Sequence, residues 1–296
     1  GVGKTTVVDL CNGRTVTIKT AEKIEKYLNR KDIFKHTNAN KGLSTTTIRD
    51  YHATISSILH QAYKEMIVTY NAAERATLPK MQKVRESKTL QPEEIQAVID
   101  ALNTEPVSLK TLIMFLMCTG CRRGEAVALT WDKVNWNKGE VLIDSSAGYT
   151  TTDGIITGST KTGKARIVAL PPELMEQLRT YRQWQMEERT ALYDAWEPSN
   201  LVFTRWNGQI LNPSTVNREL SEFCKRHALP HINPHLFRHS AASILISNGV
   251  DVLSVSQMLG HSSVSMTLNV YSHALEESRQ KTAAAVSDVI LQQKRA

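Results

Sequence analysis

Five side chains in this sequence have the types and spacing needed to bind and cleave a phosphodiester. His235 and Arg238 lie in HLFRHS, His261 lies in LGHSS, and Tyr271 follows ten residues later in MTLNVYSHA. Far upstream, TGCRRGE adds Arg122. Two arginines, two histidines and a tyrosine can surround one phosphate, and the tyrosine can attack it. Together they predict covalent catalysis on DNA.

Each residue type meets one requirement of phosphodiester cleavage without water. A phenol of pKa about 10 is a weak nucleophile until its proton is removed or the phosphate is polarised. Arginine stays charged and its planar fork binds two non-bridging oxygens, while histidine can hydrogen-bond the same oxygens or relay a proton. Loss of one such donor raises the barrier substantially, so several donors are needed.

The same residues have ordinary structural alternatives. Arg122 can pair with Glu125 on a helix surface, and a lone histidine such as His261 is often a helix cap or a satisfied core group. His235 and His239 form H-x-x-x-H, a spacing that can bind zinc, but the metalloprotease form needs Glu directly after the first histidine and here Leu follows. We therefore expect no metal, and predict that His239 packs beside the site.

Length and composition predict two globular domains. The chain has 296 residues, of which 41% are apolar and 22% charged. No apolar run reaches the roughly 18 residues of a membrane span, and the N-terminus lacks a secretory signal. We therefore expect a cytoplasmic, nucleoid-associated protein. The four cysteines are too scattered for a disulfide scaffold and are expected in the core or at helix ends.

The positive charge is concentrated near the N-terminus. Residues 1–86 hold 15 Lys+Arg and 8 Asp+Glu, whereas residues 87–296 hold 21 of each. Such an excess is typical of an electrostatic clamp for a polyanion, although a solvated lysine-rich surface would have the same composition. GVGKTT at 1–6 resembles the end of a P-loop, but the following VVDLCNGR turns too soon for a phosphate-capping helix. Nucleotide hydrolysis is not expected.

Apolar periodicity and turn residues predict a mainly helical chain with a short antiparallel region. The first segment reads as strand or irregular over 1–20, then as a helix over 21–30. A second helix begins near Ser44 or Thr45, which are good N-cap residues, and a charged linker follows Lys80. Its apolar stripe comprises Ile48, Tyr51, Ile55, Leu59, Ala62 and Met66. The apolar run over 107–118 predicts a buried helix. Further helices are expected from 92, from 122, and over 172–189, 213–227, 235–248, 252–258 and 275–290, with strands at 141–143, 155–156 and 166–170.

From about residue 88 to residue 275, the chain resembles the catalytic domain of the tyrosine recombinase (phage integrase) family. TGCRRGEAVALTW is similar to that family's first-arginine box, HLFRHS to its His-x-x-Arg box, and LGHSSVSMTLNVY to its histidine-to-tyrosine box. Conjugative-transposon integrases look nearest. The resemblance implies a mainly α fold with a small antiparallel β-sheet, in two domains. These are a helical core-binding domain over 1–80, a linker over 81–89, and a mixed α/β catalytic domain over 90–296 that includes a C-terminal helix over 275–290.

The resemblance also implies a role for each site residue. Arg122, two residues after the Thr-Gly pair, resembles the first phosphate-binding arginine better than its neighbour Arg123, and Arg238 resembles the second. The general acid should lie on the hairpin before the third strand, where Lys161 matches better than Lys164. The implied catalytic set is Arg122, Lys161, His235, Arg238, His261 and Tyr271.

The implied function is site-specific recombination of double-stranded DNA. Tyr271 would form a 3′-phosphotyrosyl link that is religated without ATP, metal or another cofactor, during integration and excision of a mobile element. A tetramer on DNA with exchange of the C-terminal helix is expected, together with an accessory excisionase and a missing N-terminal arm-binding domain. A type IB topoisomerase, a decayed recombinase that only binds DNA, and a metal-dependent nuclease or transposase are the alternatives.

Overall fold

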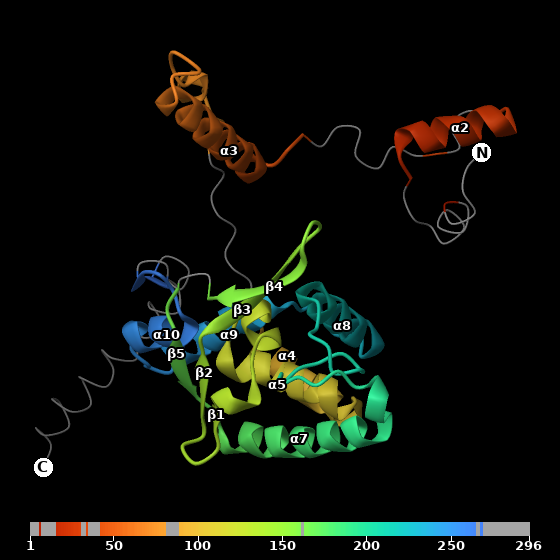
Figure 1. Cartoon of the computed structure of the whole chain (residues 1–296), viewed down its shortest axis with the longest axis vertical. Coiled ribbons are helices and arrows are strands. Elements are labelled where there is room, and N and C mark those ends of the chain that lie inside the picture. Colours follow the sequence, from red (N-terminus) through yellow and green to blue (C-terminus); the bar gives the residue numbers. More distant parts are fainter. Residues whose placement is uncertain are drawn as a thin grey trace, which may run out of the picture. The chain divides into compact units, whose positions relative to one another are not determined.

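The computed structural model describes residues 6, 16–30, 34, 42–80, 89–160, 163–264 and 267–268. The chain divides into two compact units, Gly1–Arg85 and Glu86–Ala296, drawn in Figure 1. Within the described ranges, no helix is both long and apolar enough to cross a membrane.

The N-terminal unit contains two described α-helices, α2 (Ile18–Leu28) and α3 (Thr45–Lys64), and the short 3-10 helix η1 (Ala72–Arg75). The α2 helix begins three residues earlier than the sequence predicted, because the Thr17 side chain caps it by accepting from the Thr20 N–H. The α3 helix begins as predicted, with Ser44 accepting from the Thr47 N–H. The prediction that 1–20 is strand or irregular is therefore wrong for residues 18–20, which belong to α2.

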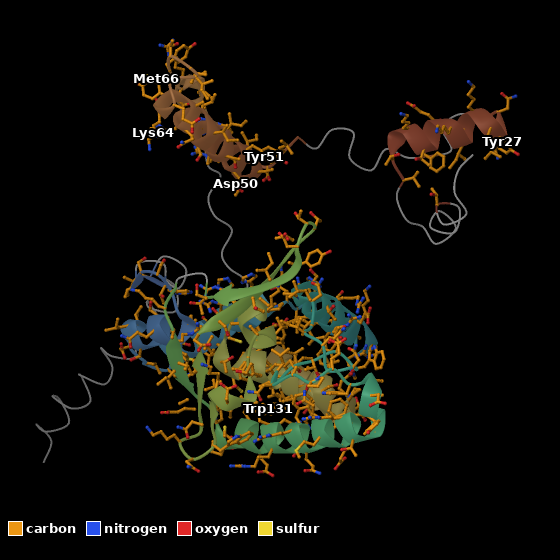
Figure 2. The ribbon with its side chains drawn as sticks, in the orientation of Figure 1. Tyr27, Asp50, Tyr51, Lys64, Met66 and Trp131 are labelled. Atoms are coloured by element: carbon orange, nitrogen blue, oxygen red, sulfur yellow. The ribbon has the colours of Figure 1, made fainter. Side chains whose placement is uncertain are left out.

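The chain after α3 folds back along that helix. The Asn71 side chain donates to the Ser56 carbonyl oxygen at 3.1 Å, and the His52 ring lies 2.8 Å from the Ala73 carbonyl oxygen. This return segment covers only one side of α3. The predicted apolar stripe is half-buried at Ile48, Leu59 and Ala62, whereas its other members are exposed, as Figure 2 shows for two of them. The exposed members are Tyr51, Ile55 and Met66.

The second unit is built around α5 (Val107–Thr119), whose side chains Ile113, Phe115 and Leu116 are fully buried. This helix packs against α7 (Pro172–Leu192) and α9 (Pro234–Ser247). Its apolar run is what the sequence predicted for a buried helix. The other described α-helices of this unit are α4 (Pro92–Ala101), α6 (Arg123–Val127), α8 (Pro213–Arg226) and α10 (Val252–Leu259).

The strands form two antiparallel sheets rather than one continuous region. One sheet has the order β1-β2-β5, from β1 (Val134–Asn135), β2 (Glu140–Ile143) and β5 (Arg166–Ala169). The second is a hairpin of β3 (Ser145–Thr150) and β4 (Gly154–Ser159), inserted in sequence between β2 and β5. The predicted fold class, mainly α with a small antiparallel β component, is confirmed. The long segment before β5 therefore forms a ladder of its own.

Candidate active site

Arg122 lies at the corner between α5 and α6. The corner is formed by Gly120, the C-cap of α5, whose φ of 57° is left-handed and favours glycine. A Cβ on Gly120 would lie 2.8 Å from Leu259 Cδ2 and 3.6 Å from Arg238 Cα. A side chain there would push α9 and α10 away from this corner. Arg122 itself is extended, and α6 begins at the next residue.

Glu125, in the first turn of α6, binds Arg122 through its carboxylate. Its carboxylate accepts from the Arg122 backbone N–H at 2.9 Å and from Arg122 Nη1 at 2.8 Å. The pairing that the sequence offered as a structural alternative is therefore present. It is not on a helix surface, because the Glu125 side chain is fully buried.

Arg166, the first residue of β5, donates hydrogen bonds to the same carboxylate. Its Nη2 and Nη1 donate to the two Glu125 oxygens at 2.6 and 3.2 Å. Burial alone would raise the pKa of Glu125, but the hydrogen bonds and charge of Arg166, with the donors of Arg122, hold it below its ordinary value. Glu125 is thus a buried carboxylate that bridges two arginines.

Arg238 reaches the same corner from α9. Only 5% of the residue is exposed, and its Nη1 donates to the Gly120 carbonyl oxygen at 2.9 Å. The bond connects the second predicted phosphate-binding arginine directly to the turn that precedes the first. Two guanidinium groups from segments more than a hundred residues apart therefore meet at one corner.

His261 completes this corner. It follows Gly260, the left-handed C-cap of α10, and its Nδ1 lies 2.7 Å from the Thr267 hydroxyl. Burial and then the positive charges of Arg238 and Arg122 lower the pKa of His261 to about 4, so the ring is neutral at pH 7. Arg122 Nη2 also donates to the Gly260 carbonyl oxygen at 3.4 Å.

His235 and Arg238 share α9 but differ in burial. His235 is exposed in the first turn of the helix, whereas Arg238 is buried. His235 lines a cavity of about 520 Å³ together with His231 and His239. Burial, and then the neighbouring His235 and Arg238, lower the pKa of His239. Among the described residues, no group of three or more His, Cys, Asp or Glu is arranged to hold a metal ion.

Two members of the predicted set, Lys161 and Tyr271, lie outside the described residues. The described part of the predicted acid turn is tight: the Gly163 N–H donates to the Thr160 carbonyl oxygen at 2.7 Å, and Gly163 has a φ of 67°. Lys164 is exposed and lines a cavity of about 630 Å³ whose other walls include Arg166 and His261. Lys164, the predicted alternative to Lys161, is therefore adjacent to the corner.

Sequence reasoning missed the role of Arg166. A signal was present: in β5 the buried positions alternate with exposed ones, and Arg166 occupies the same inward phase as Val168. A charged residue at an inward strand position needs a buried partner. That partner, Glu125, was considered only as a neighbour of Arg122.

Two guanidinium groups and a neutral imidazole at one corner, where α6, α9 and α10 converge, form an arrangement that can bind a phosphate-like anion. The chain belongs to the phage integrase family, whose sequence profile matches residues 88–278. A second profile, the phage integrase SAM-like domain, matches residues 12–78. The family and the enzyme class predicted from the sequence are confirmed.

Curated relatives and solved structures agree with this assignment. An integrase of Streptomyces ambofaciens is 32% identical over 84% of this chain and 65% of its own length. The ICEBs1 integrase of Bacillus subtilis strain 168 is 26% identical, over 90% of this chain and 72% of its own. The Tn1549 transposon integrase, solved in complex with transposon right end DNA, has the same fold with a TM-score of 0.69 at 17% identity, covering 95% of this chain and 98% of that one.

Proposed function

We propose that this protein is a site-specific DNA recombinase that integrates and excises a mobile element. The observation that supports it best is the corner shared by Arg122, Arg238 and the neutral ring of His261. The similarity to the ICEBs1 integrase and to the Tn1549 transposon integrase supports the mobile-element role. Double-stranded DNA is then the substrate.

In the proposed reaction, the Tyr271 oxygen attacks the phosphorus of one strand and forms a 3′-phosphotyrosyl bond. The bond from phosphorus to the 5′ oxygen breaks, and Lys161, with Lys164 as the alternative, gives that oxygen a proton. The phenolic proton passes to His235, the exposed histidine of α9. Attack by a new 5′-hydroxyl reverses the chemistry, so neither ATP nor a metal is required.

The arginines and His261 would stabilise the pentacoordinate phosphorus. Arg122 and Arg238 contribute fixed positive charge to the non-bridging oxygens. If His261 Nδ1 accepts from the Thr267 hydroxyl, Nε2 carries the proton and donates to the phosphate. A ring held neutral in this way donates one hydrogen bond without adding a further charge.

The remaining assignments follow the same reasoning. Residues 1–80 form the basic core-binding domain, 81–89 the linker, and 90–296 the catalytic domain. The helix predicted over 275–290 lies outside the described residues. In this proposal that segment docks onto a neighbouring protomer in a tetramer on DNA, an excisionase directs excision, and the protein acts at the nucleoid in the cytoplasm.

The test is covalent trapping. A nicked suicide duplex is prepared with the recombination site of the mobile element that encodes this protein. It is incubated with the wild type and with Tyr271→Phe, and the products are separated on a denaturing gel. We expect a protein–DNA adduct with the wild type, in the presence of a chelator as well, and none with the Phe variant. An adduct that persists in Tyr271→Phe, or that a chelator abolishes, would contradict the proposal.

A further inference from the structure

Arg166 is a buried charge that the proposed chemistry does not use. Only 9% of the residue is exposed, and β5 directs it inward together with Val168. A buried guanidinium is destabilising unless it is paired and its donors are satisfied. Its partners therefore indicate what it does.

At one end, Arg166 controls the charge around Arg122. Glu125 accepts two hydrogen bonds from Arg166 and two from Arg122, one of the latter from the backbone. With both arginines bound, the cluster keeps a net positive charge. Without Arg166, Arg122 and Glu125 form a neutral pair, and the carboxylate competes with a phosphate for the Arg122 fork.

At the other end, Arg166 fixes the segment that carries His261. Its Nε donates to the Met258 carbonyl oxygen, in the last turn of α10, at 2.7 Å. A Cβ on Gly260 would lie 2.7 Å from Arg166 Nη1, so the guanidinium occupies space that only a glycine leaves free. The position of Gly260, and therefore of His261 after it, depends on this contact.

We propose that Arg166 is a positioning residue for DNA cleavage, which acts through Glu125 on Arg122 and through the end of α10 on His261. The inference rests on the proposed function of those two residues. Arg166 itself does not touch the phosphate in this scheme. The loss of Arg166 should therefore slow cleavage without weakening DNA binding to the same extent.

The first test is a charge-rescue cycle. Single-turnover cleavage of the suicide duplex and the Kd for DNA are measured for the wild type, Arg166→Met, Glu125→Gln, and the double variant. We expect Arg166→Met to slow cleavage by roughly 100-fold, the lower end of the loss of one transition-state donor, with Kd changed by less than about threefold. The double variant should recover about tenfold of the loss, because it removes the carboxylate that would capture Arg122. Arg179→Met, at an exposed arginine of α7, is the charge-matched control and should cleave at the wild-type rate.

Cleavage at the wild-type rate in Arg166→Met, or a double variant no faster than Arg166→Met, would overturn the proposal. If Arg166→Met does not fold, Arg166→Gln takes its place in the same cycle, since it also removes the charge but keeps a side chain that can donate hydrogen bonds. An adduct that forms equally in Tyr271→Phe would instead contradict the proposed function.

A second readout needs no DNA. The side-chain nitrogens of His261 are followed by NMR through a pH titration in the wild type and in the folded Arg166 variant. We expect the pKa of His261 to rise from about 4 in the variant, because one neighbouring positive charge is lost and the end of α10 is released. An unchanged titration curve would show that Arg166 does not control His261, and would overturn that half of the proposal whatever the activity.

Discussion

Replacing Gly260 by alanine should destabilise the second unit far more than the same replacement at Gly249. Both glycines follow a helix and have left-handed φ values, 68° and 86°. A Cβ on Gly260 would meet Arg166 Nη1 at 2.7 Å, whereas a Cβ on Gly249 would meet nothing within 4 Å. The pair therefore separates the backbone cost from the cost of displacing Arg166.

The magnitude follows from these two contributions. An alanine in the left-handed region costs about 1–2 kcal/mol at either position, and the reduced freedom of the unfolded chain offsets part of this equally in both. Gly260→Ala must also displace a guanidinium that makes charged hydrogen bonds to Glu125 and Met258, the loss of one of which costs about 2 kcal/mol. We expect about 1–2 kcal/mol for Gly249→Ala and about 3–4 kcal/mol for Gly260→Ala.

The assay is urea unfolding followed by tryptophan fluorescence. All five tryptophans lie between residues 131 and 206, so the signal reports the second unit alone. Equal losses of unfolding free energy in the two variants would refute the argument that Arg166 needs the space left by Gly260.

Two further predictions concern the stability of the protein at acidic pH. Burial alone would raise the pKa of Glu105, but Arg226 and His227 hold it below 4.5. Glu105→Gln should therefore lower the free energy of unfolding at pH 7 by about 2 kcal/mol. The contribution of Glu105 is present above pH 4.5 and is lost as the pH falls through the folded-state pKa, so urea titrations of the two proteins should converge in acid. For His261, the folded pKa of about 4 lies below the ordinary 6.5, so the unfolded chain binds the proton more readily between these values. The stability that the neutral His261 ring contributes to the folded state is complete above about pH 6.5 and is lost toward pH 4. His261→Gln should therefore flatten the dependence of the unfolding free energy on pH in that window. An unchanged slope would contradict the lowered pKa of His261.

Much of the fold was predictable because its signals are local. Ser44 and Pro92 mark helix starts, and Gly260 ends α10 in the left-handed conformation expected of a C-cap. The run around Phe115 was correctly predicted as a buried helix. Periodicity could not show that the apolar side of α3 remains largely exposed, since burial depends on what packs against a helix.

The candidate site, too, was only partly predictable from local sequence. The boxes around Arg122, Arg238 and His261 are short segments whose residue types state the chemistry, and their order along the chain indicated the family. The common corner of these three residues was expected only by resemblance, and the structure now gives its contacts. The different burial of His235 and Arg238, both on α9, depends on the helix packing around them.

By itself, the sequence determined the chemical groups, the helices that carry them and the concentration of basic residues near the N-terminus. Only the tertiary structure decided that Glu125 is shared between Arg122 and Arg166, and that Arg166 lies against the glycine before His261. The physical reason is that a pairing across 41 positions, or a contact across 92, depends on how β5 packs against α6 and α10. The spacing of residues along the chain does not predict that packing.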